Sequence, residues 1–207
     1  MIITYNGCEF FKVQQGETVL ALNPISKESK YDGKISRFGS LIALSTTNHP
    51  DYNGIESVTH GDNIPVSITG PGDYEVKEIF IKGIGTKTTL DKKEYINTMY
   101  SLTLEGITLC FLGPLTKEPA TGEREGLESP DILFVPVNKE LLDPTAAYKL
   151  AVSLEPSIII PMDYDDASLK AFLKEAGQEK AERMDKLTLK KKEIEAKESE
   201  VIILTNE

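Results

Sequence analysis

Apolar and polar residues alternate over short distances up to residue 135, which favours strands over helices. Three of these runs are followed by a polar residue and a glycine: Asn6-Gly7, Gln15-Gly16 and Glu105-Gly106. Such dipeptides are typical of hairpin turns. The strands predicted from this pattern are 1–5, 9–14, 18–22, 41–44, 65–69, 74–84, 97–104, 107–112 and 132–135.

The pattern changes after residue 135, where apolar residues recur at helical spacing. One helix is expected over 139–154, with Asp143 and Pro144 as an internal start. A second is expected over 166–176, capped by Asp165 or Asp166 and ended by Gly177. A buried strand is predicted between them, at 157–161.

The segment 179–207 is charged, but it contains two apolar runs, 187–189 and 201–204, which predict a final hairpin. No repeat or low-complexity segment divides the chain, so we expect 1–207 to form a single domain. Strands followed by alternating strands and helices favour a mixed α/β fold. Two sheets with helices outside would bury both the apolar strands and the amphipathic helices.

The composition is that of an ordinary globular protein, with 40% hydrophobic and 27% charged residues. The N-terminus lacks the basic and apolar regions of a signal peptide, and no apolar run is long enough to cross a bilayer. Cys8 and Cys110 are too few for a disulfide scaffold, although they could pair with each other. We therefore expect a cytoplasmic protein with free thiols that does not span a membrane.

The net charge of −10 argues against nucleic acid as a partner, because a phosphate backbone is bound chiefly by Lys and Arg. The best basic patch is the Lys triplet at 190–192, but Glu193 and Glu195 follow it directly. Mixed charges of this kind are typical of a solvated surface.

Seven short motifs occur in a fixed order between the N-terminus and residue 164. They read YNGCEF at 5–10, LALNP at 20–24, LIALSTTNHPDYNG at 41–54, PGDYE at 71–75, FLGP at 111–114, DILFVPV at 131–137 and IPMDY at 160–164. In order and spacing they resemble the motifs of small metallo-β-lactamase-fold hydrolases, especially those similar to the ascorbate-phosphate lactonase group.

This resemblance implies a four-layer αββα sandwich, with two mainly antiparallel or mixed sheets inside and helices outside. It also implies a site at the strand ends, where His and Asp side chains bind one or two ions such as zinc. At least three protein ligands are normally needed. The ion then lowers the pKa of a bound water and supplies hydroxide as the nucleophile.

The loop 45–54 keeps only part of the Thr-His-x-His-x-Asp-His pattern that the resemblance implies. His49 and Asp51 match the second His and the Asp. Thr47 stands in the place of the first His, and Tyr52 in that of the last. His60, the only other histidine of the chain, lies in a polar stretch that predicts a surface turn. No other alignment can therefore restore a site with several histidines.

The ligand positions that follow this loop are altered too. Phe111 and Pro114 stand at the two ends of the family's His-Leu-Gly-Asp motif, and Asp163 replaces the final His. Pro offers no ligating side chain. Because Tyr52 and Phe111 are bulky and neutral, we expect them to fill part of the cleft that ions would otherwise occupy.

Several of these residues allow two interpretations. His49, Asp51 and Asp163 could form a remnant metal site, or they could make local hydrogen bonds and support the following helix, as aspartates near a helix start often do. Cys8 and Asn23 replace a His and an Asp that support the family's ligands. Cys8 could be a nucleophile or a soft ligand, but an inert buried thiol is the simpler interpretation.

The resemblance therefore predicts the fold but not an activity. Our first hypothesis is a non-catalytic binding or assembly protein that has lost most metal ligands, needs no cofactor and could self-associate. The alternative is a divergent metal-dependent hydrolase of the lactone or phosphoester class. It would bind zinc or another divalent ion through His49, Asp51 and Asp163. The sequence does not identify the ligand, substrate or partner.

Overall fold

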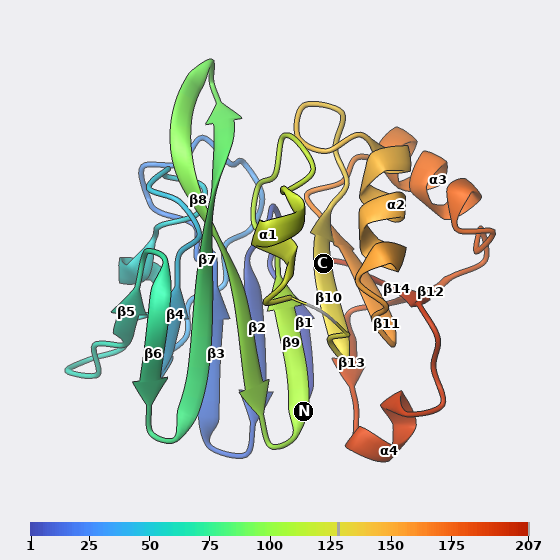
Figure 1. Ribbon diagram of the computed structural model, residues 1–207. Coiled ribbons are helices and arrows are strands. Elements are labelled where there is room, and N and C mark those ends of the chain that lie inside the picture. Colours follow the sequence, from blue (N-terminus) through green and yellow to red (C-terminus); the bar gives the residue numbers. More distant parts are fainter. Residues whose placement is uncertain (128, 207) are drawn as a thin grey trace.

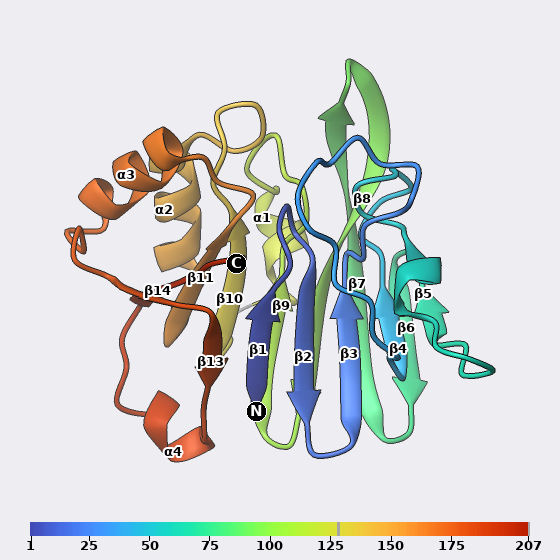
Figure 2. The ribbon, with the colours of Figure 1, turned by 180° about the vertical axis from the view of Figure 1, so that it is seen from behind.

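A computed structural model describes residues 1–127 and 129–206 as two β-sheets packed face to face (Figures 1 and 2). The first sheet contains, in order, β13 (Lys186–Thr188), β1 (Ile2–Tyr5), β2 (Phe11–Gln15), β3 (Thr18–Leu22), β4 (Ile42–Leu44) and β5 (Val66–Ile68). The second contains β12 (Glu182–Met184), β14 (Glu200–Leu204), β11 (Ile158–Met162), β10 (Ile132–Pro136), β9 (Ile107–Phe111), β8 (Lys93–Leu104), β7 (Ile79–Leu90) and β6 (Gly72–Val76). The predicted two-sheet α/β sandwich is confirmed.

Both sheets are mixed. The strands joined by hairpins, β1–β2–β3 and β6–β7–β8–β9, pair antiparallel, whereas β9, β10, β11 and β14 pair parallel. The single strand predicted at 74–84 is instead part of a hairpin. Lys77 and Glu78, both with positive φ, form the turn between β6 and β7. The β7–β8 hairpin is long, and its tip extends beyond the sandwich (Figure 1).

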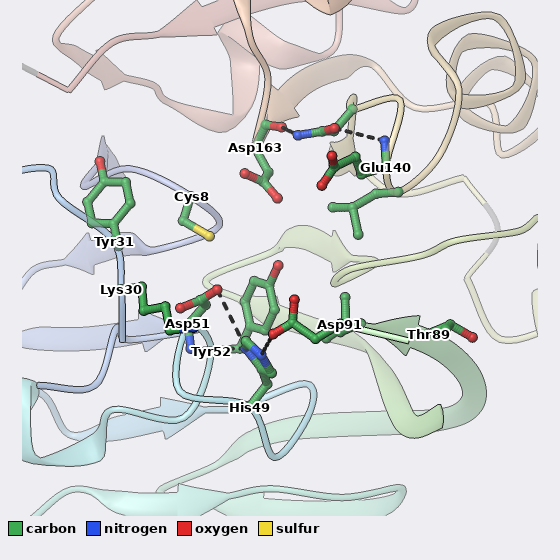
Figure 3. A pocket seen from close by; sticks show the side chains of 13 residues that line it. Cys8, Lys30, Tyr31, His49, Asp51, Tyr52, Thr89, Asp91, Glu140 and Asp163 are labelled. Atoms are coloured by element: carbon green, nitrogen blue, oxygen red, sulfur yellow. Dashed lines mark hydrogen bonds and ion pairs between the residues drawn. The ribbon is translucent and has the colours of Figure 1, made fainter. Parts of the chain in front are cut away.

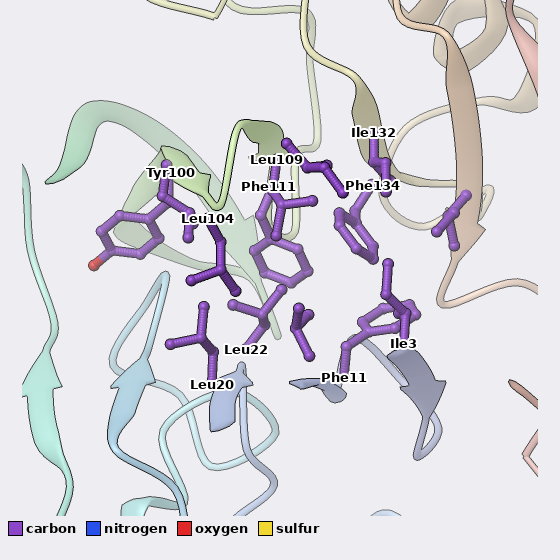
Figure 4. Packing of buried hydrophobic residues seen from close by; sticks show 14 of the residues in the cluster. Ile3, Phe11, Leu20, Leu22, Tyr100, Leu104, Leu109, Phe111, Ile132 and Phe134 are labelled. Atoms are coloured by element: carbon purple, nitrogen blue, oxygen red, sulfur yellow. The ribbon is translucent and has the colours of Figure 1, made fainter. Parts of the chain in front are cut away.

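The main core lies between the two sheets and is built by the inward-facing residues of alternating strands. At its centre three aromatic rings pack together: Phe11 lies 4.8 Å from Phe134 and 6.2 Å from Phe111, measured between ring centroids (Figure 4). All three side chains are fully buried. This core fixes how the strand ends of the two sheets lie relative to each other.

The two outer faces are covered differently. Helices α2 (Pro144–Ser153) and α3 (Asp166–Glu175) pack on the second sheet, as Figure 1 shows. The first sheet is covered by the loop between β3 and β4 and by the 3₁₀ helix η1 (Ile55–Val58), which surround a small cluster around Phe10 and Ile25. The two remaining helices are single turns, α1 (Thr121–Arg124) and α4 (Lys191–Ile194).

The helix starts follow the capping pattern. The Asp143 carboxylate accepts a hydrogen bond from the Thr145 backbone N–H at 3.0 Å, and Pro144 is the first helical residue, so α2 begins later than residue 139. The Asp165 carboxylate accepts from Ser168 N–H at 2.7 Å and caps α3. Gly177, with φ of +64°, follows the end of α3.

The predicted C-terminal hairpin is wrong. The two apolar runs join different sheets, because β13 pairs antiparallel with β1, whereas β14 pairs parallel with β11 and β12. The helix α4 lies between them. Each run therefore completes an existing sheet edge rather than pairing with its neighbour in sequence. Within the described residues, no helix has both the length and the apolar character that crossing a membrane requires.

Candidate functional site

The loops at one end of the sandwich surround a cavity of about 370 Å³ (Figure 3). They are the β1–β2 turn, the loops that follow β3, β4, β10 and β11, and the tip of the β7–β8 hairpin. The residues that line it are Cys8, Lys30, Tyr31, His49, Asp51, Tyr52, Thr89, Leu90, Asp91, Asn138, Glu140, Leu141 and Asp163. Segments far apart in sequence thus meet here because each follows the end of a strand.

His49 lies on one wall between two carboxylates. Its Nδ1 is 3.5 Å from Asp51 Oδ2, and its Nε2 is 3.4 Å from Asp91 Oδ2. The Asp51 backbone N–H also donates to His49 Nδ1 at 3.3 Å, and the Ser29 hydroxyl donates to the Asp51 carboxylate. The imidazole is 13% exposed and meets the Tyr95 ring edge-on. Both ring nitrogens thus already have carboxylate neighbours.

Asp163 lies on the opposite wall, where β11 ends. Its backbone has φ of +50°, its N–H donates to the Cys8 carbonyl at 2.8 Å, and its own carbonyl accepts from Asn138 Nδ2 at 3.0 Å. Burial, followed by repulsion from Asp51, raises the pKa of the Asp163 carboxyl to about 7. The main chain is therefore well anchored, whereas the carboxylate is destabilised in its ionised form.

Tyr52 and Cys8 occupy the space between these two walls (Figure 3). Tyr52 is 4% exposed, and its ring centroid lies 5.7 Å from that of His49. Burial is the main cause that raises the pKa of the Tyr52 hydroxyl and of the Cys8 thiol. Both groups are therefore neutral near pH 7, and the Cys8 sulfur lacks the thiolate character that a nucleophile needs.

The other predicted site residues do not line the cavity. Thr47 is buried, and its carbonyl accepts from Ser45 Oγ and the His49 N–H. The Pro114 carbonyl accepts from the Thr88 hydroxyl on β7. Phe111 does not fill the cleft as we expected, because strand alternation directs its ring into the core between the sheets.

Asn23 is fully buried below the cavity and organises a polar network. Its side-chain amide donates to the Glu9 carboxylate at 2.8 Å and to Thr46 Oγ1 at 2.9 Å, and its carbonyl accepts from the Thr46 N–H. Burial, with a smaller contribution from Asp163, raises the pKa of Glu9 well above its usual value. Among the described residues, Glu9 Oε1 has no hydrogen-bond partner.

Sequence reasoning missed Glu9, Asp91 and Glu140. Glu9 lies at the start of the predicted strand 9–14, and nothing in that pattern predicts complete burial of a carboxylate. Asp91 is in the turn that joins β7 and β8, with φ of +49°, and it reaches His49 because the hairpin is long. A polar Asp-Lys-Lys stretch between two strand-like runs was the available signal for this turn.

The residues at this site do not fit the metal centre that the resemblance to metallo-β-lactamase-fold hydrolases implies. Within the ranges 1–127 and 129–206, no group of three or more His, Cys, Asp or Glu side chains is arranged to hold a metal ion. His49 is the only imidazole at the cavity, and Tyr52 lies between it and Asp163. Structural and catalytic zinc sites need at least three ligands converging on one point.

Residues 2–163 match the family model described as a beta-lactamase superfamily domain. The chain belongs to this family, and its fold is that of the metallo-β-lactamase superfamily. A comparison with curated proteins found no match.

Solved structures share this fold over nearly their whole length. A metallo-β-lactamase superfamily protein from Thermotoga maritima, named for an expected zinc-dependent hydrolase activity, is 24% identical, with a TM-score of 0.73. The alignment covers 98% of this chain and 97% of that one. A protein from Parabacteroides distasonis, named for an expected metal-dependent hydrolase activity, is 19% identical, with a TM-score of 0.66 and coverage of 98% and 93%. Igni18, a metallo hydrolase from Ignicoccus hospitalis, is 17% identical, with a TM-score of 0.60 and coverage of 91% and 99%. At these identities the likeness defines the fold alone.

Proposed function

We propose that this protein is a non-catalytic member of the metallo-β-lactamase superfamily, which uses the cleft at the strand ends to bind a ligand. The proposal rests chiefly on the position of Tyr52. Its buried ring lies between His49 and Asp163, the positions at which a catalytic ion would need ligands from both walls. A neutral phenol at this place separates the remaining donors instead of joining them.

The charges on the two walls support the same proposal. His49 is engaged by Asp51 and Asp91, so its ring nitrogens already have partners. In active members a metal offsets the repulsion among crowded ligands. Here neutral side chains, Tyr52 and Cys8, stand at two positions where the resemblance implies histidines.

A second candidate is a metal-dependent hydrolase that uses His49, Asp51 and Asp163. The names of the structural neighbours favour it, since they refer to zinc-dependent or metal-dependent hydrolases. His49 and Asp51 are also adjacent in this structure. For an ion to bind here, Tyr52 would have to move, or the substrate would have to supply the missing ligand atoms. Unlike the non-catalytic proposal, this candidate predicts tight binding of zinc.

Titration of the metal-free protein with zinc, followed by calorimetry, is expected to give no tight one-to-one binding. One imidazole and separated carboxylates form an incomplete coordination sphere. The control is His49→Ala, which should leave the weak heats unchanged. A sub-micromolar transition that His49→Ala abolishes would favour the hydrolase.

Turnover of lactone, phosphodiester and β-lactam substrates is expected to stay at background, with or without added zinc. Without an ion-bound hydroxide, the cavity offers general bases alone, His49 and carboxylates such as Asp163, and general-base catalysis is worth roughly 10²–10⁴-fold. Steady-state assays of the wild type beside His49→Ala and Asp51→Ala test this. Activity above background that both substitutions remove would contradict the non-catalytic assignment.

A further inference from the structure

The cavity carries an excess of negative charge. Its carboxylates come from four separate loops and are Asp51, Asp91, Glu140 and Asp163. The basic side chains that line it are Lys30, whose residue is exposed, and His49, which is engaged by the carboxylates on its own wall. Asp163 and Glu140 lie on the other wall, and no ion pair joins either of them to a described residue.

Asp163 is the most deeply placed of these carboxylates that lack a positive partner among the described residues. Its carboxylate points into the cavity, as Figure 3 shows, while its backbone N–H and carbonyl bond to Cys8 and Asn138. The neutral Cys8 thiol and Tyr52 hydroxyl lie within hydrogen-bonding reach of its side chain and partly offset the rise of its pKa, but neither brings a positive charge. The charges that act on it are those of Asp51 and Glu140, which are also negative. A sheltered carboxylate with only like charges around it needs an external positive group.

A single metal ion is a poor match for this arrangement. An ion needs several oxygens within roughly 2–2.6 Å of one point, whereas these carboxylates stand on different walls and form no such group in the described part of the chain. An organic cation carries N–H donors at several positions along its length. A cavity of about 370 Å³ is in the usual range for a small molecule. The rings of Tyr31 and Tyr52 on its walls could attract cationic groups.

We propose that this cavity binds a small organic polycation, a di- or polyamine, whose ammonium groups donate to Asp163 and to carboxylates on the facing loops. The inference rests on the proposed function, because it requires a cleft that binds rather than hydrolyses. The ligand class follows from the negative charge of the lining, from the absence of an ion pair to Asp163 within the described residues, and from the separation of the acidic groups.

The probe is 1,4-diaminobutane, and 1,4-butanediol is the neutral control of the same chain length. Both are titrated calorimetrically at low ionic strength and at about pH 8, where a carboxyl with a pKa of about 7 is ionised. We expect one-to-one binding of the diamine with a Kd below about 1 mM and no binding of the diol. Asp163→Asn should weaken diamine binding at least about tenfold, the usual effect of losing one charge-assisted hydrogen bond.

Asp62→Asn is the matched variant, because it removes one carboxylate from an exposed turn outside the cavity. If the diamine binds at the cavity and is not held merely by the negative net charge of the protein, this substitution should change its affinity by less than about twofold. Glu140→Gln provides a second test on the cavity rim and should also weaken binding. Equal binding of the diol, equal losses in Asp62→Asn and Asp163→Asn, or no diamine binding at all would overturn the proposal.

The zinc titration and the turnover assay separate this inference from the proposed function. If the diamine fails to bind while zinc binding and turnover are also absent, only the ligand class is wrong. Tight zinc binding accompanied by turnover would contradict the proposed function itself, whatever the diamine does.

Discussion

Phe111→Ala is expected to lower the free energy of unfolding by about 3–5 kcal/mol, a large part of the roughly 5–15 kcal/mol that keeps an ordinary domain folded. The Phe111 ring is fully buried and lies 5.6 Å from Phe134 and 6.2 Å from Phe11, measured between centroids. Its removal would leave a cavity between the two sheets. The hydrogen bonds between paired strands limit how far the surrounding backbone can shift to fill that cavity. Urea denaturation of both proteins measures the difference.

Phe80→Ala is the matched control, because Phe80 is 66% exposed on β7, which is separated from β9 by β8 in the same sheet. Its loss should change stability by no more than about 0.5 kcal/mol. If Phe111→Ala proved equally mild and instead altered ligand binding, Phe111 would belong to the cleft, as the sequence first suggested, and the core described above would be wrong.

Much of the fold could be predicted because its early elements are local. The hairpins β1–β2–β3 and β8–β9 join residues that are close in sequence, and their Gly-containing turns and alternating residues specify the pairing. The C-terminal segment differs. Leu187 and Ile202 are buried in the same core, but their strands join opposite sheets. Hydrophobicity indicates that such a run is buried, but it does not identify its partner strand.

The site was predicted only in part, for a related reason. The order of motifs placed His49, Asp51 and Asp163 at strand ends, and the structure brings all three to one cavity. The burial of Glu9 and the approach of Asp91 depend on how a turn and a long hairpin fold over that cavity. Neither effect leaves a periodic pattern in the sequence, so the acidic character of the lining could not be foreseen.

Asp163→Asn is expected to stabilise the protein above pH 7 and to have little effect near pH 4. The folded-state pKa of Asp163 is raised to about 7 from 3.8, so the folded protein holds this proton more tightly than the unfolded chain. The contribution of Asp163 to the free energy of unfolding of the wild type is therefore fully present below pH 3.8. It is lost as the pH rises from 3.8 to about 7. With one pKa unit worth about 1.4 kcal/mol, the gain in the variant reaches at most roughly 4 kcal/mol.

Asn is a suitable replacement because it tolerates the positive φ at this position and keeps the size of the side chain. Asp165→Asn is the control two residues away, where hydrogen bonding from the Ser168 backbone is the main cause that lowers the pKa of an exposed carboxyl. Its contribution has the opposite sign, so that variant should lose a little stability as the pH rises from acid to neutral. Denaturation of the three proteins at several pH values distinguishes the two directions. If wild type and Asp163→Asn kept a constant difference across the range, the Asp163 carboxyl would titrate normally, and the cavity would not hold the uncompensated charge on which cation binding depends.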